Sequence, residues 1–163
     1  MRLSAHTVSP ADRMQRDRAP GFSILELLVV VAMILTIAAI AMPAYMKAVH
    51  RARAVKAIGD LKAIAVEIDL ATANGLLPLD LAAIGMDGLR DPWGNAYVYV
   101  RLDGRRTRGR ARKDKNLVPI NSDYDLYSVG RDGITASALT SEPSWDDVVR
   151  GNDGGFYGLA TDY

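Results

Sequence analysis

One run of 21 residues near the N-terminus, 22–42, contains only three polar side chains, Ser23, Glu26 and Thr36. As an α-helix it would be about 31 Å long at 1.5 Å per residue, which matches the hydrocarbon core of a bilayer. The apolar core of an ordinary secretory signal peptide is shorter, roughly 7–15 residues. The run therefore predicts a membrane-spanning helix.

The residues that flank this run predict its orientation. Residues 1–21 hold four arginines against two aspartates and show no apolar period, which is typical of a leader rather than of a folded segment. By the positive-inside rule the N-terminus then lies in the cytoplasm, and everything after Pro43 lies across the membrane. We expect Pro43 to close the span, because its missing N–H and its ring interrupt the helical hydrogen-bond ladder and permit local unwinding.

Glu26 is the fifth residue of the apolar run, where a carboxylate is costly. An acidic residue near the centre of a membrane helix costs roughly 2.5–3.5 kcal/mol, and less near an end. An intramembrane glutamate therefore indicates a function and a partner, and a free amine is the candidate partner. The alternative hypothesis, an uncleaved single-pass anchor, would have to account for a carboxylate at this position.

After the span, residues 44–73 keep a helical period. Apolar residues recur among charged ones and predict a buried helix face made of Val55, Ile58, Leu61, Ile64, Ala65 and Ile68. Asn74 and Gly75 are typical of a helix C-terminus. Together with the span, this predicts one helix of roughly fifty residues.

The remainder of the chain predicts a small sheet. Residues 96–102 and 125–130 are rich in aromatic and β-branched side chains, and turn signals at 91–95 and 103–104 bound the first of them. We expect antiparallel pairing. The fold class is therefore α+β: a long N-terminal helix, its first half transmembrane, packed on a small antiparallel β-sheet.

Several functions are excluded or disfavoured by composition. The chain has no cysteine, which excludes disulfides, zinc thiolate sites and thiol catalysis, and its net charge of +1 gives no reason to expect a nucleic-acid partner. No serine-hydrolase, zinc-protease or P-loop motif is present, so we expect no enzyme. Residues 105–115 carry seven basic side chains and one acid, and predict an exposed, solvated loop; a lipid-headgroup or acidic-partner patch is the alternative.

The segment 21–27, Gly-Phe-Ser-Ile-Leu-Glu-Leu, resembles the cleavage motif of type IV prepilins and type II secretion pseudopilins. The resemblance implies that a membrane prepilin peptidase cuts between Gly21 and Phe22 and N-methylates Phe22. The Glu26 carboxylate could then lie against the Phe22 α-amino group of a neighbouring copy, and breaking this pair would strand a buried charge worth several kcal/mol. Pro43 also falls where family members carry a proline that lets the helix stretch in the filament.

Two further motifs narrow the resemblance. Residues 91–95, Asp-Pro-Trp-Gly-Asn, and 124–133, Tyr-Asp-Leu-Tyr-Ser-Val-Gly-Arg-Asp-Gly, are similar to the general secretion pathway protein G group, the major pseudopilins of type II secretion. This implies a type IV pilin-like fold and a homopolymer, the periplasmic pseudopilus, which drives protein export. Its implied partners are minor pseudopilins, an inner-membrane assembly platform and the prepilin peptidase.

The resulting domain organisation has four segments. They are a cleaved leader (1–21), a transmembrane and filament-core helix (22–43), its periplasmic continuation (44–74), and a periplasmic β domain with a C-terminal metal-binding loop (75–163). The protein would be a single-pass bacterial inner-membrane protein before assembly. Two alternatives stay open: a type IV pilus pilin for adhesion, motility or DNA uptake, and an uncleaved membrane-anchored binding domain that uses the basic segment 105–115.

The resemblance also implies calcium near the C-terminus, where type IV pilins commonly have a disulfide. Calcium takes about six to eight oxygen ligands. Matching by order in the chain suggests as ligands the Val129 carbonyl and the carboxylates of Asp132, Asp146 and Asp147, with Asp153 as an alternative. Aspartates in such loops are also common turn formers and helix caps, and residues 146–149 could form a short helix.

Overall fold

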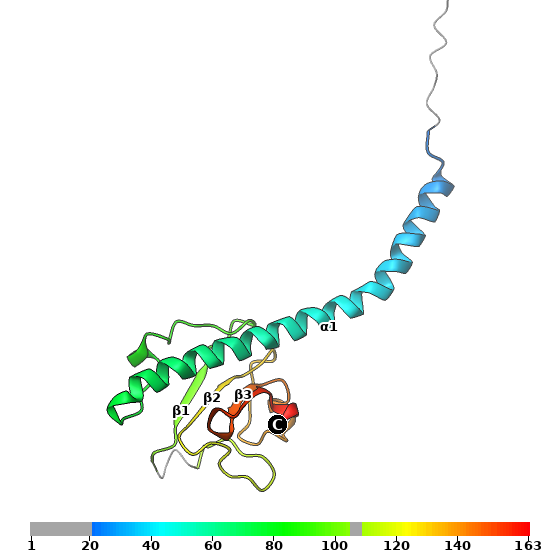
Figure 1. Cartoon of the computed structure of the whole chain (residues 1–163). Coiled ribbons are helices and arrows are strands. Elements are labelled where there is room, and N and C mark those ends of the chain that lie inside the picture. Colours follow the sequence, from blue (N-terminus) through cyan, green and yellow to red (C-terminus); the bar gives the residue numbers. More distant parts are fainter. Residues whose placement is uncertain (1–20, 105–108) are drawn as a thin grey trace, which may run out of the picture. The chain divides into compact units, whose positions relative to one another are not determined.

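The computed structural model describes residues 21–104 and 109–163. Within them the chain forms one long helix, α1 (Ile24–Ala71), and four strands, β1 (Val98–Arg101), β2 (Tyr124–Ser128), β3 (Val148–Gly151) and β4 (Phe156–Leu159) (Figure 1). Short 3₁₀ turns lie between them. Of the predicted leader, only Gly21 lies within the described residues.

The chain divides into two compact units that meet between Pro43 and Ala44. In the first unit every described residue is exposed, and nearly all are apolar. Among the described residues, α1 is the one helix long and apolar enough to cross a membrane. The apolar surface of residues 24–43 is therefore without a partner inside its own unit.

α1 continues through Pro43, which confirms the prediction of one helix of roughly fifty residues. Proline removes one N–H from the ladder, but the residues around it, Ala41, Met42 and Ala44, are good helix formers. The predicted C-terminal stop is confirmed. Gly75 has a left-handed φ of 86° and donates its N–H to the Thr72 carbonyl at 2.7 Å.

The sheet is antiparallel throughout, with the strands in chain order β1-β2-β3-β4. Tyr127 of β2 lies opposite Val98 of β1 on one side and Val149 of β3 on the other. β1 falls within the predicted segment 96–102, β2 begins one residue before the predicted segment 125–130 and ends two residues before its end, and the α+β fold class is confirmed. The alternative of a short helix over 146–149 is wrong, because Val148 and Val149 begin β3. β4 was not predicted.

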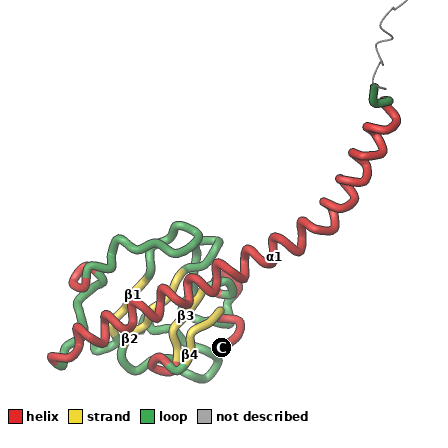
Figure 2. Tube along the Cα trace, turned by 45° about the horizontal axis from the view of Figure 1, so that its top comes forward, coloured by secondary structure: helices red, strands yellow, loops and turns green. Residues whose placement is uncertain are grey.

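The second half of α1 packs along one face of this sheet (Figure 2). Leu61, Ile64 and Ile68 are fully buried, together with Tyr124, Leu126 and Val148 of the sheet. Burial of such side chains is the main stabilising term, at about 25 cal/mol per Å² of apolar surface. The predicted helix face is confirmed except at Val55, which is 61% exposed.

Arg150 on β3 holds the C-terminal strands to β2. Its buried side chain donates to both carboxylate oxygens of Asp123, each at 2.8 Å, and to the Tyr124 carbonyl at 3.1 Å. The guanidinium also stacks on the Tyr124 ring, 3.9 Å from its centroid. Burial alone would raise the pKa of Asp123, but the hydrogen bonds from Arg150 and the Tyr124 amide outweigh it and hold that pKa below its usual value.

We predict that Asp123→Asn destabilises the folded chain at neutral pH and that this defect fades in acid. The folded-state pKa of Asp123 is lowered. The ionised carboxylate therefore stabilises the folded chain fully above the ordinary carboxyl pKa of about 3.9, and this stabilisation is lost as the pH falls through the folded-state value. Its side chain is 34% exposed. After solvent screening we expect a loss of roughly 1 kcal/mol.

Urea unfolding of the wild type and the variant from about pH 7 to about pH 2 measures this difference. The exposed loop change Asp87→Asn is the control. A difference that stays constant down to the lowest pH would contradict the assignment to the Arg150–Asp123 pair.

Candidate functional site

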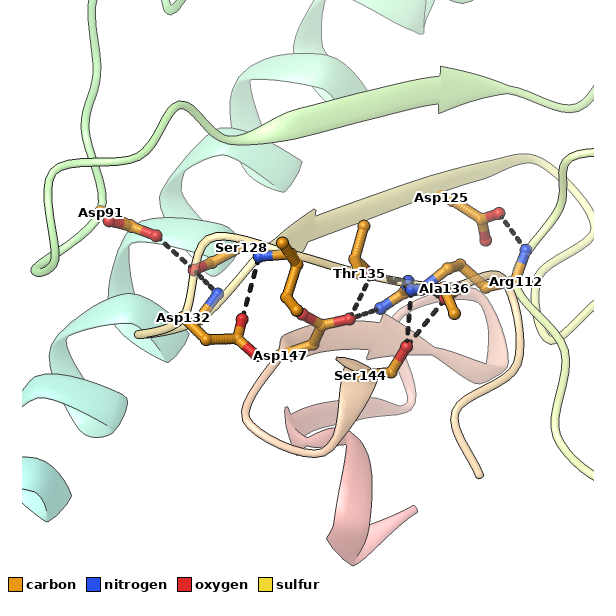
Figure 3. A network of polar contacts seen from close by, with 11 residues as sticks. Asp91, Arg112, Asp125, Ser128, Asp132, Thr135, Ala136, Ser144 and Asp147 are labelled. Atoms are coloured by element: carbon orange, nitrogen blue, oxygen red, sulfur yellow. Dashed lines mark hydrogen bonds and ion pairs between the residues drawn. The ribbon is translucent and has the colours of Figure 1, made fainter. Parts of the chain in front are cut away.

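The two motifs of the sheet region that carry the family resemblance lie against each other. Asp91 Oδ1 accepts the backbone N–H groups of Trp93 at 3.0 Å and Asn95 at 2.8 Å, which closes the turn between them. Asp91 Oδ2 accepts the Ser128 hydroxyl at the end of β2, at 2.5 Å (Figure 3). Asn95 Nδ2 donates to the Gly130 carbonyl at 2.8 Å. The turn therefore fixes where the chain leaves β2.

Gly130 begins the loop that connects β2 to β3. Its φ is +69°, and a Cβ at this position would lie 2.4 Å from the Asp146 carbonyl oxygen, so only glycine fits. Directly beside it, Asp146 Oδ2 accepts the amides of Arg131 at 2.7 Å and Asp132 at 3.0 Å. Asp132 Oδ1 in turn accepts the Ile134 amide at 2.9 Å. These carboxylates hold the two ends of the loop together.

Asp147, the next residue, is fully buried and forms an ion pair with the buried Arg112 (Figure 3). Thr135 Oγ1 donates to the same Asp147 oxygen at 2.5 Å. Arg112 Nη1 donates to Thr135 Oγ1 at 2.5 Å and to the Ala136 carbonyl at 2.6 Å. One cation thus joins three segments that are far apart in the sequence.

The surroundings of Arg112 complete this network. Its guanidinium lies over the Tyr127 ring, 4.0 Å from the centroid, and its backbone N–H donates to Asp125 Oδ2 at 2.7 Å. Burial raises the pKa of Asp125, and the N–H groups of Arg112 and Asn121 only partly oppose this.

Arg112 is the residue that reasoning from the sequence missed. It belongs to the basic segment 105–115, which was predicted to be an exposed loop; residues 105–108 lie outside the described residues. Arg110, Lys113 and Lys115 are exposed, but Arg112 is only 2% exposed, so the prediction is wrong at this position. A run of alternating basic residues gives no signal that one of them is buried.

The three predicted carboxylate ligands of calcium do not converge. The Asp146 carboxylate accepts the Asp132 amide at the loop surface, whereas the Asp147 carboxylate pairs with the guanidinium of Arg112. Asp147 Oδ1 has no hydrogen-bond partner among the described residues, yet a second cation there would face Arg112. No group of three or more His, Cys, Asp or Glu in the described segments is placed to hold a metal ion. Asp153 instead accepts the Ser122 amide and hydroxyl.

This arrangement does not fit an ion that takes six to eight oxygens from the predicted set. Calcium binding by the chain stays a prediction. The cation that pairs with Asp147 in this structure is the guanidinium of Arg112.

Comparison with known proteins identifies the family. It is 32% identical over 142 residues to the type II secretion system core protein G of Pseudomonas aeruginosa, and the match covers 74% of this chain and 89% of that protein. The chain belongs to this pseudopilin family. No protein-family model and no solved structure matches the chain.

Family membership confirms the prediction of a major pseudopilin over the type IV pilus alternative. The contacts described above hold one loop of the pseudopilin on its sheet. The pseudopilin joins the loop 130–146 to its sheet through Asp91, Gly130 and Asp146, and closes it from inside through Arg112 and Asp147.

We predict that Arg112→Met costs the pseudopilin about 3–5 kcal/mol of unfolding free energy, because it leaves Asp147 as an uncompensated buried charge. The double variant Arg112→Met, Asp147→Leu should recover most of this loss. Urea unfolding of the full chain in detergent measures both, with the exposed Lys113→Met as control. Urea unfolding of the same variants with added calcium and with a chelator shows whether calcium can replace the Arg112 guanidinium. Full repair of Arg112→Met by calcium would contradict the assignment of this place to the guanidinium.

Proposed function

We propose that this pseudopilin is the building block of a periplasmic filament that works in type II protein export, and that it is not an enzyme. The observation that carries the proposal is the apolar first part of α1, which is exposed along its length in a chain whose relative is a core component of that system. Between residues 22 and 46, Glu26 is the one charged side chain. Such a helix is stable in a bilayer or in a bundle of identical helices.

The segment before α1 suits processing. Residues 21–23 are not helical, and Gly21 and Phe22 are exposed, so the bond between them is accessible to a peptidase. We propose cleavage there by a prepilin peptidase and N-methylation of Phe22. The chain would then sit in the inner membrane with its N-terminus cytoplasmic and its second unit periplasmic, until an assembly platform and minor pseudopilins start the filament.

Besides the Phe22 amine of a neighbouring copy, Glu26 has a partner within its own chain, Ser23. The Glu26 amide donates to Ser23 Oγ at 3.1 Å, and the Ser23 amide donates to Glu26 Oε2 at 3.5 Å. This is a capping box, in which two residues satisfy each other's free N–H groups at a helix start. After cleavage, Ser23 becomes the second residue of the chain, and Glu26 lies four residues after Phe22, which carries the new α-amino group. We propose that in the filament it pairs with the Phe22 amine of a neighbour.

We predict that the pseudopilin purified from its native membrane begins at N-methylated Phe22. Intact mass and N-terminal sequencing test this, with a strain that lacks prepilin peptidase as the control, in which the chain should keep residues 1–21. A chain that begins at Met1 in both strains would favour an uncleaved anchored domain and would overturn the proposed function.

We predict that Glu26→Gln abolishes filament assembly while leaving membrane insertion intact. A capping role alone costs about 1 kcal/mol when lost, whereas an unpaired charge in an apolar bundle costs several. Ser23→Ala is the matched control, because it removes the cap and keeps the carboxylate. Sheared filament fractions, quantified by immunoblot, separate the two roles. Equal assembly defects in both variants would reduce Glu26 to a helix cap.

A further inference from the structure

A groove of about 970 Å³ lies along residues 50–58 of α1. Its other walls are Trp93, the loop around Trp145, and β4. Two large apolar side chains in it are open to solvent, Val55 at 61% exposure and Trp145 at 52%. The charged groups at its edge are His50, Arg51, Arg131, Asp132, Asp146 and Asp162. Nothing among the described residues of the second unit covers these apolar side chains.

The second unit also carries an apolar projection, the leucine loop, residues 75–80, directly after α1 and its terminal 3₁₀ turn. Leu76 and Leu79 are 76% and 79% exposed. The loop is nonetheless anchored, because the Pro78 carbonyl accepts the Tyr99 hydroxyl at 3.0 Å and Asp80 Oδ1 accepts the Ala83 amide at 3.0 Å. It therefore presents two leucines in a fixed position.

Charge is divided along α1 and the leucine loop, whereas the other walls of the groove hold Arg131 against Asp132, Asp146 and Asp162. Residues 44–58, which include the helix side of the groove, contain four cations and no acid: Lys47, Arg51, Arg53 and Lys56. Residues 66–89, which include the leucine loop, contain four acids and no lysine or arginine: Glu67, Asp69, Asp80 and Asp87. All of these except Glu67 are exposed residues, and Lys56 forms an ion pair with Asp60 of its own copy at 2.7 Å. Such complementarity steers association and sets orientation.

The two features cannot meet within one copy. Val55 and the end of α1 at Ala71 are separated by sixteen residues, which is about 24 Å along a helix. A second copy displaced by about that length or more along the helix axis would bring its groove to the leucine loop of the first. This contact is heterologous, since two different surfaces meet, and repetition of it gives an open helical filament.

We propose that the groove of one pseudopilin takes the leucine loop of the next copy along the filament, with Leu76 and Leu79 against Val55 and Trp145 and the acidic end of one copy against the basic end of the other. The proposal rests on the filament function proposed above. A bilayer surface would attract the cations of residues 44–58 but would leave the leucine loop and its acids without a partner. A second copy provides a partner both for the cations of residues 44–58 and for the leucine loop with its acids.

The cysteine-free chain offers a direct test. The full-length double variant Val55→Cys, Leu79→Cys is expressed in a secreting strain, filaments are sheared off, and disulfides are formed with a mild oxidant. We expect a ladder of dimers, trimers and longer species, because each copy carries both halves of the contact. The matched control is Val55→Cys with Leu117→Cys, since Leu117 is also exposed but lies outside the leucine loop. Each single variant should give no ladder.

A second variant tests the energy of the contact. Leu79→Asp should reduce the filament fraction at least about tenfold, while Leu117→Asp should not. Because Leu79 is exposed, both variants should show wild-type far-ultraviolet spectra and unfolding curves.

The outcomes separate this inference from the proposed function. Filaments that assemble without Val55–Leu79 crosslinks, or crosslinks from Val55 to lipid-associated or secreted proteins only, would overturn the groove contact and leave the filament function in place. Failure of the wild-type chain to enter any filament would overturn both.

Discussion

The packing of one side of α1 on the sheet is the constraint on which the rest of the chain depends. Leu61, Ile64 and Ile68 are fully buried there, and α1 is the one α-helix among the described residues. The same helix is apolar on all sides over residues 24–42 apart from Glu26 and Thr36, where no sheet lies beside it within its unit. The second half of α1 is therefore packed on apolar residues of its own chain, whereas residues 24–42 need lipid or other copies to cover their apolar surface.

Two buried arginines hold together segments that are distant in the sequence, as disulfides do in many exported domains of this size. Arg150 joins β3 to the residues before β2, and Arg112 joins its own segment to Thr135 and Asp147. A buried ion pair adds little net stability compared with apolar packing, but removal of one partner is costly. The pairs therefore specify one arrangement of a glycine-rich tail whose apolar content is low.

The sequence was sufficient for the elements with strong periodicity and insufficient for the contacts of the tail. The helix, its stop at Gly75 and strands β1 and β2 follow from apolar period and turn residues, all of which are local signals. β3 and β4 are short, and half of their residues are Gly, Arg or Tyr, so no alternating pattern marks them. Asp147 looked like an exposed ligand because its partner, Arg112, lies 35 positions earlier in a run of solvated cations. Val55 fitted the helix period, yet it lines an open groove and is 61% exposed.

The unsatisfied surfaces of the second unit also limit how copies can assemble. An antiparallel pair of helices would bring the basic residues 44–58 of each copy to the acidic residues 66–89 of the other and would satisfy the charges. It would, however, place the two apolar segments 24–42 at opposite ends, and they could not then share one bilayer with the same orientation. A parallel pair without displacement sets like charges side by side. Parallel copies displaced along the helix axis avoid both problems. They keep every apolar segment on the membrane side and still bring opposite charges and the exposed leucines and Trp145 together.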